Sequence, residues 1–170
     1  MERVWVFDHL AVAVARIDFL DPEVAGTPDA RERGVRIEIR PARWSSHGSI
    51  YVSDSASLDP ALCRIDLLES AAGAADRMHW HPSMPDGEPG SRTFEPAMPP
   101  DPVGWLTAFL GDLGDYLASS DAPGASAMAD DLEAVRAARD EIGRAVDEGL
   151  AWAREDWPVA THDPRGRAIA

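Results

Sequence analysis

The first half of the chain alternates apolar and polar residues, and this period of two limits its possible folds more than any other feature. The clearest case is residues 35–40, which run Val35, Arg36, Ile37, Glu38, Ile39 and Arg40. Residues 10–20 and 62–69 alternate in the same way, and residues 4–7, 49–53 and 77–81 are shorter candidates. Successive side chains of a strand point to opposite faces, so these segments predict half-buried β-strands. We expect the strand at 35–40 to end, or to become an edge, at Pro41.

A proline-rich segment follows the predicted strands. Residues 82–102 contain seven of the fourteen prolines of the chain, together with Gly87 and Gly90. Helices and central strands do not tolerate this density, because proline has no backbone N–H to donate. We therefore expect a long irregular loop over residues 82–101. Loops of this length inside a domain are usually functional or mobile.

After the loop, apolar residues recur at helical spacing. One helix is predicted at about 102–119, with Asp101 as its N-cap and Pro102 at its first position. A second is predicted at about 127–155. Strands followed by helices indicate an α+β fold. In this fold a mostly antiparallel sheet, residues 4–81, would be covered on its apolar face by the two C-terminal helices.

Length and composition indicate one domain over residues 1–170, with residues 158–170 as a loosely held tail. No run of about 18 apolar residues is present, so no membrane span is expected. The single cysteine, Cys63, excludes an internal disulfide and favours a cytoplasmic location. We expect Cys63 to be a small buried core residue.

The net charge of −14 argues against two classes of partner. Nucleic acids and anionic membranes are both bound through clustered Lys and Arg. All 16 basic residues are arginine, a usage that is typical of proteins from high-GC bacteria. The remaining partner classes are a small-molecule ligand, another protein, or further copies of the chain in a homo-oligomer.

If the strands pair into one sheet, the face opposite the apolar one is strongly polar. It would carry Arg16, Asp18, Arg36, Glu38, Arg40, Arg64, Asp66, His79 and His81. Two interpretations remain open. The face is either solvated, with weak cross-strand ion pairs, or curled so that it lines a polar pocket suited to acid–base or metal chemistry.

The densest chemical signal lies on this face, at His79-Trp80-His81. In an extended strand both imidazoles point to the same side, where they can ligate a first-row metal ion. Asp86 and Glu88 follow in a turn-rich stretch that could fold back and supply an oxygen ligand. The predicted site binds one divalent Fe, Mn, Ni or Zn ion through His79, His81, and Asp86 or Glu88, with His47 or His162 as a possible third histidine. Two alternatives stay open: a metal-free acid–base or ligand pocket, and histidines that only hydrogen-bond the loop.

The spacing Gly73, five residues, His79-Trp80-His81 resembles the first half of the cupin metal motif. The resemblance covers about fourteen residues. It departs from the family in having Asp86 where a glutamate is expected, and in having helices where the second motif would follow. The resemblance implies a mononuclear metal bound by His79 and His81 with a carboxylate from Asp86 or Glu88.

Two functions fit these features. The first is a small bacterial enzyme or metal-binding protein in which His79 and His81 act as ligands or as acid and base, with Asp86 or Glu88 as third ligand. Asp66 would be a further catalytic residue. Arg16, Arg36, Arg64 and Trp80 would then bind a small anionic substrate. The second is an acidic interaction protein without catalysis, such as an inhibitor, an immunity-type protein or an accessory subunit. Exposed Trp44, Trp80 or Trp105 would support the second function, because tryptophan often anchors interfaces.

Overall fold

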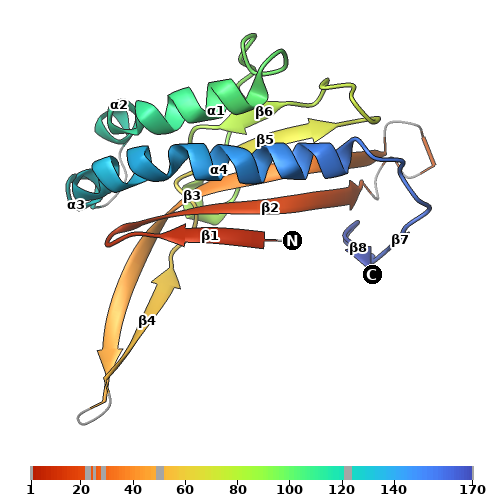
Figure 1. Ribbon diagram of the computed structural model, residues 1–170. Coiled ribbons are helices and arrows are strands. Elements are labelled where there is room, and N and C mark those ends of the chain that lie inside the picture. Colours follow the sequence, from red (N-terminus) through yellow and green to blue (C-terminus); the bar gives the residue numbers. More distant parts are fainter. Residues whose placement is uncertain are drawn as a thin grey trace.

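The computed structural model describes residues 2–21, 24, 26–27, 30–48, 52–120 and 124–169. It has the predicted α+β architecture: a six-stranded antiparallel sheet followed by helices that pack on it. Figure 1 shows α1, α2 and α4 on one side of the sheet. Along the sheet the strands are β1 (Glu2–Val6), β2 (Leu10–Leu20), β3 (Arg31–His47), β5 (Cys63–Glu69) and β6 (His79–His81), and β4 (Ser53–Leu58) pairs with β3 alone.

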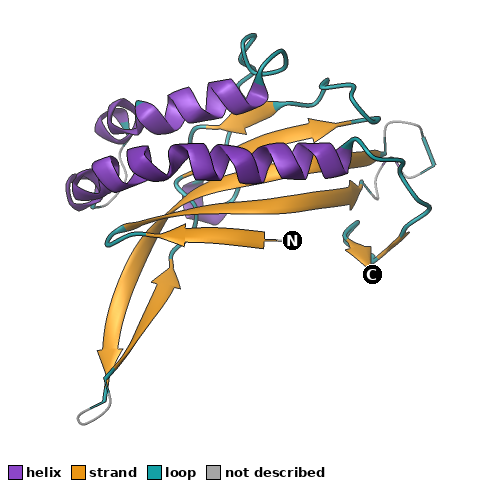
Figure 2. Cartoon of the chain, in the orientation of Figure 1, coloured by secondary structure: helices purple, strands orange, loops and turns teal. Residues whose placement is uncertain are grey.

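Strand β3 is longer than its alternating pattern predicted. Pro41 does not end this strand, because β3 continues to His47, but the strand does become an edge there, which is the second of the two predicted outcomes. Pro41 is tolerated where β3 changes partners. Before it β3 pairs with β2 and β5, and after it only with β4. Beyond Pro41 the two strands form a hairpin that extends away from the rest of the molecule (Figure 2). Of the strand expected at 49–53, residues 49–51 lie outside the described part of the chain, and β4 begins at Ser53.

The helices begin where the sequence predicted but are more divided. Asp101 caps α1 (Pro102–Gly111) by accepting a hydrogen bond from the Gly104 N–H at 2.9 Å. The chain breaks at Asp112 and resumes as α2 (Leu113–Ser119), beside two residues of low helix propensity, Gly111 and Gly114. The second predicted helix is α3 (Ala125–Met128), a 3₁₀ turn at Ala129–Asp131 and α4 (Leu132–Ala153).

The loop 82–101 contains one 3₁₀ turn, Pro85–Gly87, and otherwise no helix. It does not leave the sheet. Thr93 forms an antiparallel bridge with Trp80, so this part of the loop lies beside the edge strand β6. The loop therefore lies next to the two histidines.

The core lies between the sheet and the helices. Fully buried side chains from both layers meet there, among them Leu10, Ile37, Ile39, Ile65, Leu67, Leu106, Leu110, Ile142 and Leu150. The strand register places Arg16 opposite Val35, and Asp18 opposite Arg33. Val35 belongs to the core, so Arg16 and Asp18 point to the helix side of the sheet and not, as predicted, to the polar face with Arg36 and Asp66. The alternation of apolar and polar residues identified the strand. Which of its two faces turns toward the helices depends on the register in which it pairs with β3.

The segment after α4 contacts the end of β2. Its short strands β7 (Thr161–His162) and β8 (Ala168–Ile169) pair with each other. Arg167 bridges Phe19, and the Leu20 N–H donates to the Gly166 carbonyl at 2.7 Å. These contacts place the C-terminal segment beside the end of β2. Among the described residues, no helix is both long enough and apolar enough to cross a membrane.

Cys63 is a core residue, as predicted. Its side chain is fully buried in β5, and burial raises the pKa of its thiol to about 12. Because the thiolate is the reactive form, we expect a disulfide reagent at pH 8 to label native Cys63 more than about a hundredfold slower than the urea-unfolded chain. The absorbance of the released thiolate reports both rates. Rapid labelling of the native protein would contradict this burial.

Candidate metal centre

Both histidine side chains of β6 point to the face of the sheet opposite the helices. His79 and His81 are 4% and 5% exposed, and each uses its Nδ1 for a backbone hydrogen bond. The His79 Nδ1 lies 2.9 Å from the Arg77 carbonyl, and the His81 Nδ1 lies 2.7 Å from the Gly90 carbonyl. A carbonyl can only accept, so both Nδ1 atoms carry the proton. In the neutral rings both Nε2 atoms therefore carry lone pairs.

Asp66 completes the cluster from the neighbouring strand. Register pairs Asp66 of β5 directly with His79 of β6. The Asp66 Oδ1 accepts a hydrogen bond from the Arg36 Nε at 2.6 Å. This contact holds the carboxylate so that Oδ2 is left to face the imidazoles. Arg36 thus orients a candidate ligand from behind, as hydrogen-bonded partners do in many metal sites.

The three free ligand atoms lie at metal-binding separations. The two Nε2 atoms are 3.2 Å apart, and the Asp66 Oδ2 lies 3.7 Å from that of His79 and 3.8 Å from that of His81. A point equidistant from all three lies about 2.1 Å from each, which matches the roughly 2.0–2.2 Å bonds of zinc to nitrogen and oxygen. Among the described residues, these three form the group of His, Cys, Asp and Glu that could hold an ion.

The surroundings of His79 favour its neutral form. Burial lowers the pKa of His79 below the usual value, and the nearby Arg92 and His81 lower it further. The hydrogen bond to Arg77 and the charge of Asp66 act in the opposite direction. Metal binding needs an unprotonated imidazole, so the lowered pKa keeps this ligand available at neutral pH.

The cluster opens into a hollow of about 820 Å³ on the polar face of the sheet. Of the residues expected to bind substrate, Arg16, Arg36 and Arg64 line this hollow together with the three ligand residues. Arg36 and Arg64 also pair with carboxylates, Asp66 and Glu38. Arg16 reaches the hollow from the helix side, where its guanidinium lies 5.1 Å from the ring centre of Trp152. Arg36 and Arg64 therefore lie on the same face of the sheet as the two histidines, whereas Arg16 lines the hollow from the helix side.

Trp80 lies on the opposite side of β6. Its ring contacts those of Trp105, Phe109 and Tyr116 at 5.6 to 6.2 Å between centres, between the sheet and the helices. It does not line the hollow at the histidines, as alternation along a strand requires. Its indole nitrogen is buried without a hydrogen-bond partner among the described residues.

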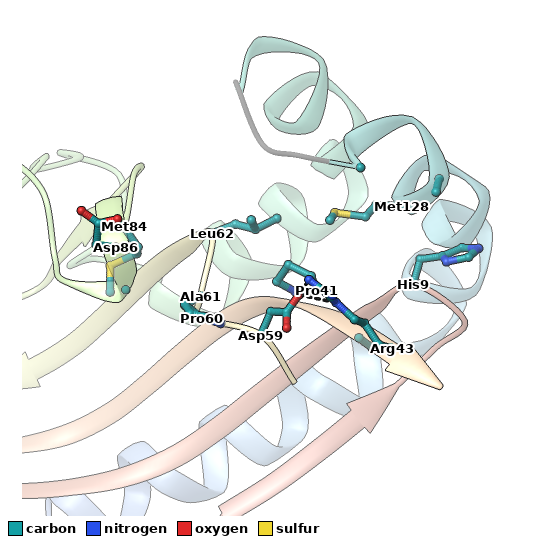
Figure 3. A pocket seen from close by; sticks show the side chains of 14 residues that line it. His9, Pro41, Arg43, Asp59, Pro60, Ala61, Leu62, Met84, Asp86 and Met128 are labelled. Carbon is teal, nitrogen blue, oxygen red and sulfur yellow. Dashed lines mark hydrogen bonds and ion pairs between the residues drawn. The ribbon is translucent and has the colours of Figure 1, made fainter. Parts of the chain in front are cut away.

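Asp86 and Glu88 lie elsewhere, with exposed side chains. Asp86 lines a different hollow of about 580 Å³, between the base of the β3–β4 hairpin and α3, where Met84, Leu62 and Met128 also lie (Figure 3). Neither residue belongs to the group of ligand atoms that could share an ion. The carboxylate beside the histidines is Asp66, which the sequence singled out only as a catalytic partner.

The two other histidines considered as ligands also lie apart from the cluster. His162 faces Asp18 at 3.4 Å, and His47 hydrogen-bonds Ser45 at the far end of β3. Two contributors were not anticipated, the Gly90 carbonyl and Arg92, both from the loop 82–101. The alternating pattern was sufficient to predict Asp66 as a candidate ligand, because Asp66 lies on the same face as His79 and His81. No sequence pattern predicts that the Gly90 carbonyl of the loop would bond His81.

Compared with known proteins, the chain matches no family model, no curated protein and no solved structure. The resemblance of residues 73–86 to the cupin motif therefore stays local to that short stretch.

Proposed function

We propose that this protein is a small metal-dependent enzyme whose single divalent transition metal ion is bound by Asp66, His79 and His81. The observation that supports this most directly is the meeting of two imidazole Nε2 atoms at 3.2 Å. Both Nδ1 atoms already donate to carbonyls, so two lone pairs face each other beside a carboxylate oxygen. Such an arrangement is repulsive until a cation occupies it.

A proton is the competing cation, and it fits less well. A shared proton would make one imidazole of the pair an imidazolium, and burial lowers the pKa of His79, so that this form is disfavoured on His79. A metal ion would bind all three ligand atoms at once, whereas a proton can bridge only two. Two histidines and one carboxylate are a common ligand set for Fe(II), and also suit Mn, Ni and Zn.

Three protein ligands leave coordination positions open toward the hollow. A metal ion bound there would polarise a substrate oxygen or lower the pKa of a bound water. Arg36 and Arg64 face the same hollow and supply positive charge for an anionic substrate. The function that follows is metal-assisted acid–base chemistry on a small anionic molecule.

Metal analysis of untagged protein tests this proposal. We expect about one equivalent of Zn²⁺ or Co²⁺ after dialysis, and Co²⁺ should give visible absorption bands of a nitrogen–oxygen site. His79→Ala/His81→Ala should abolish stoichiometric binding, because it removes two of three ligands. The matched control, His9→Ala/His47→Ala, removes two exposed histidines and should leave binding unchanged. Circular dichroism verifies that both variants fold. Wild-type protein that binds no metal, or equal binding by both variants, would contradict the proposal.

One observation favours the second function, an interaction protein. Trp44 lies on the extended β3–β4 hairpin and is 51% exposed, whereas Trp80 and Trp105 are half-buried. An exposed tryptophan on a projecting hairpin is a feature of binding surfaces. If the metal analysis fails, this function becomes the better supported one.

A further inference from the structure

We propose that the hollow beside the metal ligands binds an organic acid with an apolar body, whose carboxylate lies at the metal and whose body extends along the sheet toward β8. This inference rests on the proposed metal function and adds to it the class of substrate. It follows from the charge of one end of the hollow, the apolar character of the other, and the distance between them.

The end of the hollow near the histidines attracts anions. Although the chain carries a net charge of −14, Arg36, Arg64 and Arg92 line this end of the hollow, where Asp66 is the lining carboxylate. Arg92 has an exposed side chain there and makes no ion pair with a carboxylate in the described part of the chain. Its charge acts on His79, so it lies within electrostatic reach of the metal ligands. A carboxylate bound at the metal would neutralise Arg92 without breaking an existing ion pair.

The other end of the hollow combines apolar side chains with the charged Glu32 and Arg167. Ile17 of β2 and Leu68 of β5 both pair with Gly34 of β3, so no β3 side chain stands between them. Phe19 lies two residues beyond Ile17 on the same face of β2 and extends this apolar surface. Ile169 of β8, which is 53% exposed, lines the same end of the hollow. Leu68 is already buried, but an apolar group placed here would cover the half-buried Ile17 and Phe19 and the exposed Ile169.

The register orders the two ends along the strands. Asp66 and Arg36 pair at one level, Leu68 and Gly34 two residues further, and Phe19 with Glu32 two residues beyond. Two strand residues span about 7 Å, so the apolar surface begins about 7 Å from the ligand level and continues to about 14 Å. A carbon chain of roughly six to ten atoms covers that distance. A volume of about 820 Å³ accommodates such a molecule.

Calorimetric titration of zinc-loaded protein with butanoate, hexanoate, octanoate and decanoate tests the inference. We expect affinity to rise by up to about fourfold per added methylene over the longer acids, because each one becomes buried on the apolar surface. Octylamine should bind much more weakly than octanoate. Arg92→Gln should weaken every acid by a similar factor, whereas Arg139→Gln, on the exposed side of α4, should change nothing.

A second variant isolates the apolar end. Ile17→Thr/Phe19→Thr should remove most of the dependence on chain length while leaving butanoate binding unchanged, and Val4→Thr on β1 is its control. If the double variant does not fold, the wild-type series and Arg92→Gln still decide the question. Affinity that is independent of chain length, insensitive to Arg92→Gln, or equal for octylamine would overturn the inference. Protein that binds zinc but gives any of these results keeps the metal function, whereas protein without zinc overturns both.

Discussion

Replacing Gly34 with alanine is expected to lower the free energy of unfolding by more than about 3 kcal/mol, because an added methyl group would collide with backbone. A Cβ at this position would lie 2.1 Å from the Leu67 carbonyl oxygen and 2.8 Å from the Leu68 Cα. Neither atom can rotate away, since both belong to the neighbouring strand β5. The collision would separate β3 from β5 two residues from Arg36, and so displace the partner of Asp66 as well.

Urea unfolding followed by tryptophan fluorescence measures this loss. The matched control is Gly111→Ala, at the end of α1, where the contact of the new Cβ is the tip of the flexible Arg139 side chain at 3.2 Å. That side chain can move, and alanine favours a helix, so this variant should be as stable as the wild type or slightly more stable. Equal stability of the two variants would show that β5 leaves room for a Cβ at Gly34.

The second large effect is expected for Asp131→Ala, with a loss of about 2–4 kcal/mol in the free energy of unfolding. The Asp131 carboxylate is 4% exposed and accepts hydrogen bonds from three consecutive backbone N–H groups. They belong to Asp8 at 3.3 Å, His9 at 2.6 Å and Leu10 at 2.7 Å. These contacts join the turn between β1 and β2 to the start of α4. Alanine would leave at least the buried Leu10 donor without a partner.

The neighbouring Asp130 provides the control, because its side chain is exposed in the same 3₁₀ turn. Asp130→Ala should change stability by less than about 0.5 kcal/mol. Asp131→Asn is informative as well: it keeps an acceptor oxygen but loses the charge, so its loss should lie between those of the two alanine variants. If Asp131→Ala were as stable as Asp130→Ala, these hydrogen bonds would not contribute to holding the turn.

Much of the candidate site was predictable, for a local reason. Side chains two residues apart on a strand point to the same face. His79 and His81 therefore had to lie together wherever the strand was placed. The same alternation placed Asp66, Arg36 and Arg64 on the polar faces of their own strands. Trp80, between the histidines, had to point to the other side, and treating it as a substrate contact overlooked that constraint.

The choice of carboxylate was not predictable in this way. Asp86 and Glu88 are near the histidines in sequence, but the turn at residues 85–87 places Asp86 against a different hollow. Asp66 is thirteen residues before His79 and becomes its neighbour only because β5 and β6 pair at that register. Distance along the chain is a poor guide to ligands once strands pair, since cross-strand neighbours are closer than loop neighbours.

By itself the sequence determined the class of fold, the helix start at Asp101, the burial of Cys63 and the shared face of the two histidines. Each of these depends on periods and caps that act over a few residues. Only the tertiary structure decided that Arg16 and Asp18 turn toward the helices, that β3 runs through Pro41, and that Asp66 and the Gly90 carbonyl complete the cluster. Those features depend on which strands pair and in which register, and that is settled by packing of the whole sheet against the helices.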